Sequence, residues 1–227
     1  MQRLSTSRVL APPDRSRTGP AQPWVIRLYE AADEVAWAVR LNLLWLLFTL
    51  AGLVVLGVGP ATMAAYTLAR RHAQAESFAA FPAFLAAYRR EFVRGTALLL
   101  PVLGVSVFLA GNYFYFASLG PAAVLPRLAT LAALAIVVVI GAYLLPMAAH
   151  YDLRAYAYLP KASLFALARP APSALLLLVA TAVGYASVTY PFLVLVVAVG
   201  GWIQLDTWLC LRFFAENEAR LRAERIP

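Results

Sequence analysis

Charged residues are scarce in this chain. Only 13% of its 227 residues are Asp, Glu, Lys or Arg, whereas 63% are hydrophobic, and the mean hydropathy is +0.74. A water-soluble fold of this size would carry charge on every element. The composition therefore excludes an ordinary soluble domain and predicts an integral membrane protein whose first partner is the lipid bilayer.

Residues that build catalytic and metal sites are equally rare. The chain has one cysteine, Cys210, and two histidines, His72 and His150. A single thiol cannot form an internal disulfide, and so few thiol and imidazole groups argue against a metal centre. The sequence also contains no Walker loop, HExxH, GxSxG or GxGxxG motif. We therefore predict no metal, no cofactor and no enzymatic activity.

The basic residues that are present give a net charge of +8. Nearly all are arginines that flank apolar runs, which is typical of bilayer-spanning chains rather than of nucleic-acid-binding proteins. Residues 1–22 hold Arg3, Arg8, Arg15 and Arg17 among several prolines and show no apolar periodicity. We predict that this segment is a flexible tail and that nucleic acid is not a partner.

Four long stretches contain no Asp, Glu, Lys or Arg. They have 29, 32, 24 and 36 residues and cover 41–69, 95–126, 128–151 and 170–205. One crossing of the hydrocarbon core needs about 20 residues. The last stretch continues past Asp206 to Leu211 and is long enough for two crossings, so we predict a helical hairpin that turns at Pro191.

The first stretch predicts a helix over 41–56, a break at 57–60 and a short second limb from Pro60 to Ala69. The limb would be about 15 Å long, half the thickness of a membrane. If it folds back, the chain has six passes, and 18 of its 19 basic residues lie on one side. A five-pass arrangement divides them 12 to 7. The positive-inside rule favours six passes, with the first two as a hairpin and both termini cytoplasmic.

Two further segments are amphipathic. Residues 23–39 place polar and apolar side chains on opposite faces, and we predict a helix along the cytoplasmic surface. Residues 78–92 have an aromatic stripe at helical spacing. The stripe indicates either an interfacial connector between two spans or a docking helix for a partner. The candidate docking residues are Phe78, Phe81, Leu85, Tyr88 and Phe92.

The predicted fold class is therefore an all-α, polytopic transmembrane bundle. Its parts are a tail at 1–22, the interfacial helix at 23–39, a transmembrane domain at 40–213 and a cytoplasmic C-terminal tail at 214–227.

The order of these segments is similar to that of a known family. The sequence Asn-Leu-Leu-Trp-Leu-Leu-Phe at 42–48, Gly-Pro-Ala at 59–61 with Tyr66, the aromatic segment 81–92 and the segment 146–152 together resemble the YesL-like family of bacterial membrane proteins. The resemblance covers about 41–214. It implies a small polytopic protein of unsettled biochemical role, often encoded near carbohydrate ABC-transport and sugar-utilisation genes, and it supplies no catalytic residues. We expect the protein in the bacterial cytoplasmic membrane.

Polar groups at membrane depth are the candidate sites. Asp206 is the only acidic residue in a predicted span, where it costs roughly 2.5 to 3.5 kcal/mol on insertion scales. It either reaches interfacial water or binds a proton or cation inside the bundle.

The break at 57–60 is the second candidate, because irregular backbone in a bilayer must be buried in protein or face a water-filled cavity. Gly57, Gly59, Pro60 and Thr62 would line that cavity. The alternative is a kink packed against Gly104 and Gly111 of the next span.

Three other polar groups have simpler explanations. His150 and Asp152 suit a charged helix end better than acid–base chemistry. In the segment 112–116, Asn112 is followed by four aromatic residues, which indicate an interface belt rather than a sugar-stacking surface. Asn42 and Trp45 lie one turn apart and suggest packing and anchoring.

Two functional hypotheses follow. The first is an accessory protein without enzymatic activity beside a carbohydrate uptake system, whose partner would be a sugar ABC-transporter permease. The second is a self-sufficient small transporter or channel that uses the break at 57–60 and Asp206. A membrane-embedded enzyme ranks third, because no nucleophile and base can be paired. The sequence leaves a homo-oligomer open.

Overall fold

The computed structural model describes residues 23–151 and 155–224, and in this part of the chain every regular element is a helix. The chain divides into two compact units, Met1–Glu34 and Val35–Pro227. Of the first, the structure describes only residues 23–34, which form the beginning of helix α1. The following description concerns the second unit. Residues 1–22, predicted to be a tail, lie outside the described residues.

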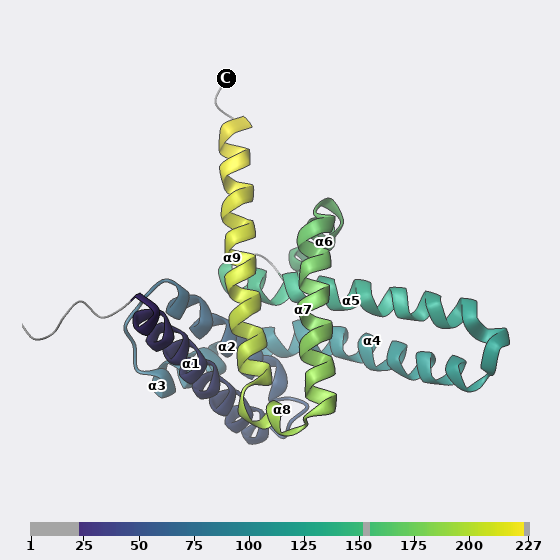
Figure 1. The fold of residues 1–227 in the computed structure, drawn as a ribbon, viewed down its shortest axis with the longest axis horizontal. Helices are drawn as coiled ribbons and strands as arrows, with labels where there is room; N and C mark the ends of the chain where they lie inside the picture. The colour runs from purple at the N-terminus through teal and green to yellow at the C-terminus, as the bar shows by residue number, and fades with distance from the viewer. Residues whose placement is uncertain (1–22, 152–154, 225–227) are drawn as a thin grey trace, which may run out of the picture. The chain divides into compact units, whose positions relative to one another are not determined.

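Helix α1 runs without interruption over Pro23–Ala51 (Figure 1). The sequence predicted a separate interfacial helix at 23–39 and a second helix at 41–56, but no helix-breaking residue lies between them. The helix also ends five residues earlier than predicted. Leu53 and Val54 adopt left-handed backbone conformations, with φ of 59° and 61°, and the Val54 amide donates to the Thr49 carbonyl at 2.9 Å. This pattern terminates a helix, but it is unusual for a β-branched residue and could not be read from the sequence.

Helix α2 covers Val58–Ala73 and runs back alongside α1. The Trp45 indole donates a 2.9 Å hydrogen bond to Thr62 Oγ1, and further along both helices the rings of Trp37 and His72 stack at 4.4 Å. These pairings make α1 and α2 antiparallel. At about 24 Å, α2 is longer than the predicted limb, because it begins before Pro60 and continues through the two arginines at 70 and 71.

Helix α2 is the centre of the core. Every residue from Gly59 to Ala69 except Thr67 is buried, and the helix packs against α3, α4, α5 and α9. Its closest neighbour is α4, where a Cβ on Gly59 would lie 2.7 Å from Thr96 Cα. The predicted packing of this corner against Gly104 and Gly111 is wrong, since both of those glycines face open space. Instead, the beginning of α4, at Gly95 and Thr96, meets the beginning of α2 at Gly59.

The predicted amphipathic helix at 78–92 is divided in the structure. Helix α3 covers Ala80–Arg90, and α4, Phe92–Ser118, starts directly after Glu91. A short 3₁₀ turn, Gly120–Ala123, then leads into α5, Val124–His150. Helices α4 and α5 form a hairpin that extends to the right in Figure 1.

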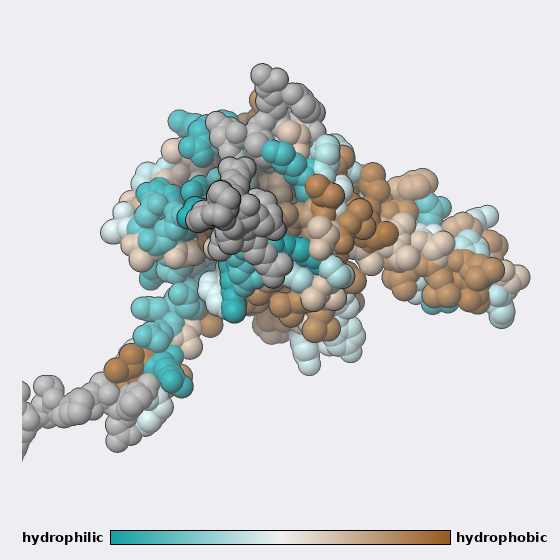
Figure 2. All heavy atoms as spheres, turned by 90° about the horizontal axis from the view of Figure 1, so that it is seen from above, coloured by the Kyte–Doolittle hydropathy of each residue, from teal (hydrophilic) through white to brown (hydrophobic). Residues whose placement is uncertain are grey.

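Much of the outer hairpin surface is apolar. Figure 2 shows mainly hydrophobic residues on the part of the molecule that corresponds to α4 and α5. Val107, Phe108, Phe114 and Leu125 are all exposed there. In the described residues, four segments are long and apolar enough to cross a membrane: Trp24–Ala51, Phe92–Ser118, Gly120–His150 and Pro170–Thr189. An exposed apolar surface on such helices is what lipid contact requires, and it supports the prediction of an all-helical membrane protein.

The remaining helices are α6, Ala155–Ala168; α7, Pro170–Thr189; α8, Phe192–Val196; and α9, Ala198–Glu224. The chain turns between α7 and α8 at Pro191, where the sequence placed a hairpin. The predicted C-terminal tail begins at 214, within α9, which remains helical through Glu224.

Candidate functional site

Asp206 lies at the junction of α2, α5 and α9. Its side chain is 0% exposed, so it does not reach interfacial water as one of the two expectations held. The Tyr66 hydroxyl of α2 donates a hydrogen bond of 2.5 Å to Asp206 Oδ2. Among the described residues, Asp206 takes part in no salt bridge. The carboxyl group is therefore held by a neutral donor rather than by a cation.

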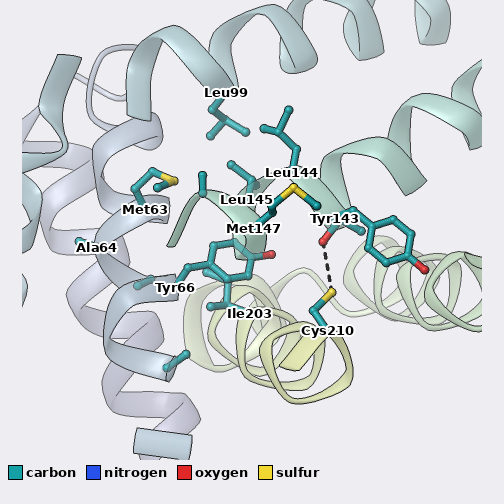
Figure 3. Packing of buried hydrophobic residues seen from close by; sticks show 14 of the residues in the cluster. Met63, Ala64, Tyr66, Leu99, Tyr143, Leu144, Leu145, Met147, Ile203 and Cys210 are labelled. Atoms are coloured by element: carbon teal, nitrogen blue, oxygen red, sulfur yellow. Dashed lines mark hydrogen bonds between the residues drawn. The ribbon is translucent and has the colours of Figure 1, made fainter. Parts of the chain in front are cut away.

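A proline on α5 explains why Cys210 lies beside Asp206 and the Ala142 carbonyl. Pro146 has no N–H, which leaves the Ala142 carbonyl without its helical donor. The Cys210 sulfur lies 3.7 Å from that carbonyl oxygen, a contact drawn as a dashed line in Figure 3, and 3.6 Å from Asp206 Oδ1. The single thiol hydrogen can be donated to either oxygen. Tyr66, Asp206 and Cys210 thus join three helices through polar contacts inside an apolar core.

A small cavity of about 10 Å³ lies next to this cluster, and its lining includes Tyr66, Arg70, His150 and Thr207. Thr207 Oγ1 and Arg70 Nε are both buried without a hydrogen-bond partner. A space of about this size holds one water molecule when polar groups surround it. Both atoms belong to residues that line the cavity, which makes it a candidate site for one buried water.

The candidate cavity residues at the break between α1 and α2 are tightly packed. A Cβ on Gly57 would lie 2.4 Å from the Thr49 carbonyl oxygen, and Gly57, Gly59, Pro60 and Thr62 are all buried. The Thr62 hydroxyl donates to the Val58 carbonyl at 2.6 Å and accepts from Trp45. The contact of Asp206 with α2 is at Tyr66, one turn beyond Thr62, so the two candidate sites are neighbours along α2. Their use as a cavity or ion site stays a prediction.

The candidate docking stripe packs partly on the protein itself. Phe81 and Tyr88 lie against Phe48 of α1, with ring centroids 5.7 and 5.1 Å away, and Phe78 makes an edge contact with Trp37. Leu85 is half-buried. The most buried aromatic residue of α3 is Phe84, which the stripe does not include.

Phe81 and Phe92 of the stripe remain exposed, and Phe92 belongs to α4. Docking of a partner at this surface stays a prediction.

Asn42 has a larger role than the sequence indicated. Its Nδ2 donates to the carbonyls of Val194 and Leu195 at 3.1 and 2.9 Å. Its Oδ1 accepts from the amides of Val199 and Gly200 at 3.1 and 3.0 Å. One side chain of α1 therefore completes the backbone hydrogen bonding where α8 ends and α9 begins. The signal in the sequence was an Asn inside an apolar run.

Glycine is required at the same crossing, because a Cβ on Gly200 would lie 2.2 Å from the Ala38 carbonyl oxygen. The close approach of α1 to α9 brings Asn42 within reach of the joint.

Arginines gather at one end of the helices. Arg70 Nη1 and Arg94 Nη2 donate to the carbonyls of Ala149 and Ala148, each at 3.1 Å, and so cap the C-terminus of α5. Arg94 also bonds the Tyr158 hydroxyl. The opposite end of the α4–α5 hairpin carries Arg127, which donates to the Tyr113 hydroxyl at 2.8 Å.

Two other sequence candidates are now placed. His150 stacks against Phe214, with ring centroids 5.7 Å apart, while Asp152 lies outside the described residues. In the aromatic segment at 112–116, Phe114 and Tyr115 are exposed near the end of α4.

Comparisons with known proteins identify a family and two relatives. Residues 38–113 match the model of a family described as "Protein of unknown function, DUF624". The chain is 34% identical over 167 residues to the uncharacterized protein YesV of Bacillus subtilis, which covers 73% of this chain and 79% of the relative. It is 33% identical over 152 residues to the uncharacterized protein YesL of the same organism, covering 65% of this chain and 71% of the relative. No solved structure matches the chain.

Proposed function

The chain belongs to the DUF624 family, with YesV and YesL as relatives, and on that premise we propose that it is a six-pass protein of the bacterial cytoplasmic membrane without enzymatic activity. Its role is that of an accessory factor for a carbohydrate uptake system of the ABC type. The resemblance to the YesL-like family suggests this biological setting.

Six passes require α2 and the first half of α9 in addition to the four candidate spans. The antiparallel pairing of α1 and α2, through Trp37 with His72 and Trp45 with Thr62, supports the first of these. The arginine-capped end of α5 would face the cytoplasm, since basic groups are concentrated there and Arg127 stands alone at the other end of the hairpin. Both termini then lie in the cytoplasm.

One observation carries the accessory role. Polar side chains hold the helices of this bundle together: Asn42, Tyr66 and Asp206 do so while buried, and Arg94 while half-buried. The α4–α5 hairpin, in contrast, presents a long apolar surface to its surroundings. Such a division suits a protein that meets other membrane helices through its outer faces rather than one that performs chemistry inside.

Topology is tested by labelling single cysteines with a membrane-impermeant maleimide in whole cells, in a Cys210→Ala background. Ala75 is exposed and is a suitable position in the arginine-rich connector, whereas Ala87 is buried; Ala86, which is exposed, replaces it. Leu125, at the opposite end of the hairpin, is the control for the outer side. We expect labelling at Leu125 only. Labelling at Ala75 or Ala86 from outside contradicts the six-pass arrangement.

The accessory role is tested in two steps. Affinity purification from native membranes should recover a carbohydrate permease together with the tagged chain, and deletion of the gene should lower uptake of the corresponding sugar. Recovery of the chain alone, with normal uptake in the deletion strain, would refute the proposal.

A specific cavity favours the transporter as a second candidate. It measures about 320 Å³, lies between α5, α7 and α9, and is lined by Tyr66, Ser187 and Trp202 among small apolar residues. Because Tyr66 also bonds Asp206, a solute in this cavity would lie one hydrogen bond away from the buried carboxyl group. Solute flux by the purified protein in liposomes, abolished by Asp206→Asn, would support this function over the accessory role.

A further inference from the structure

A second large cavity opens at the arginine-rich end of the helices. It has a volume of about 350 Å³ and is formed by the last turn of α5, by α6, by Arg169 directly before α7, and by the middle of α9. Its lining includes Met147, Leu164, Phe165, Phe214, Lys161 and Arg169. None of the described lining residues is acidic.

The cavity has two cations at its polar side. Lys161 is the one charged residue of α6 and is exposed. Arg169 directly precedes Pro170, the first residue of α7, so the positive end of the α7 helix dipole lies beside it. Its guanidinium group is 5.1 Å from the Phe165 ring centroid, and Nη1 donates to the Phe213 carbonyl at 3.4 Å. These contacts fix the position of the guanidinium group at the cavity.

The walls of the cavity are apolar and continue to the outer surface. Met147 and Phe214 are buried at its base, while Leu164 is 68% exposed at its edge. Leu159 and Leu167 of α6 are exposed as well. A short helix that exposes leucines and a single lysine is typical of the boundary between lipid headgroups and acyl chains, where the lysine stem lies along apolar surface and its amine reaches the headgroups.

We propose that this cavity is a binding site for an anionic phospholipid. Lys161 and Arg169 would bind the phosphate group, and the upper part of an acyl chain would lie against Met147, Leu164 and Phe214. Basic pockets between transmembrane helices on the cytoplasmic side bind anionic headgroups in this way. A soluble phosphate would use the same two cations but would gain nothing from the apolar wall. That the ligand is a lipid of the cytoplasmic leaflet rests on the membrane orientation proposed above.

The test is a lipid titration of the full chain, purified in detergent, followed by native mass spectrometry. The probes are phosphatidylglycerol and, as a zwitterionic lipid with the same chains, phosphatidylcholine. We expect retained binding of phosphatidylglycerol and much weaker binding of phosphatidylcholine. Lys161→Gln should weaken phosphatidylglycerol binding about fivefold, and the double variant with Arg169→Gln on the order of 20-fold. Lys161→Arg should retain binding.

Arg89→Gln is the matched control, because Arg89 is exposed on α3 and does not line the cavity. If Lys161→Gln and Arg89→Gln bind phosphatidylglycerol equally well, the site is refuted. If inorganic phosphate displaces the lipid at comparable concentrations, or if Leu164→Ser binds the lipid as the wild type does, the ligand is a free phosphate and the lipid assignment fails. Because the titration is done in detergent, its outcome is independent of the labelling experiment that tests the membrane orientation.

Discussion

Replacement of Asn42 by alanine gives the most direct test of how α1 is joined to α8 and α9. In the wild type, this side chain makes four hydrogen bonds of 2.9 to 3.1 Å to backbone groups of α8 and α9. Asn42→Ala removes all four at once, and two carbonyls and two amides lose their partner. The side chain is fully buried, so water cannot readily replace it.

The expected loss follows from these contacts. Hydrogen bonds between helices in a membrane contribute on average about 0.6 kcal/mol each, and a typical protein hydrogen bond contributes roughly 0.5 to 1.5 kcal/mol. Four of them therefore contribute about 2 to 6 kcal/mol to the free energy of unfolding. Asn42→Leu keeps a side chain that branches at the same carbon, leaves no cavity and removes the same hydrogen bonds, so it should be destabilised to at least a similar degree.

Unfolding by sodium dodecyl sulfate in mixed micelles, followed by circular dichroism, measures this loss. Asn112→Ala is the matched control, since Asn112 is half-buried on the α4–α5 hairpin and should change stability by less than about 0.5 kcal/mol. If Asn42→Leu is as stable as the wild type, the side chain acts by filling space and the role assigned to its hydrogen bonds is wrong. If Asn42→Ala matches Asn112→Ala, Asn42 does not hold the α8–α9 joint at all.

Two further predictions concern the core. Gly95→Ala should destabilise the protein by about 1 to 3 kcal/mol in the same assay, because the added Cβ would lie 2.9 Å from the Gly59 carbonyl oxygen; Gly111→Ala, in open space, should be neutral, and equal effects would contradict the close contact of α2 with α4. Tyr66→Phe and Asp206→Ala should show a coupling of about 1 to 2 kcal/mol in a double-mutant cycle, because the first variant removes the donor and the second the acceptor of the same hydrogen bond; additive effects would show that the bond contributes nothing.

The class of the protein could be predicted from its sequence because hydrophobicity is a local property. Apolar stretches of more than 20 residues must be helical in a bilayer, where each backbone group needs a partner within its own segment. The turn at Pro191 was also predictable, since proline breaks the hydrogen-bond ladder of a helix. The end of α1 at Ala51 was missed, because the left-handed Leu53 and Val54 contradict the preference of their residue types.

The buried polar contacts were decided by tertiary structure alone. Asn42 lies 157 residues from Val199, and Tyr66 lies 140 residues from Asp206. Both faces of an apolar helix look alike in sequence, so nothing local shows how the helix is rotated or which neighbour it meets. That depends on close approach at positions such as Gly59 and Gly200, where two backbones must fit together before the side chains can pair. The sequence determined that these polar groups needed partners, and packing determined which partners they have.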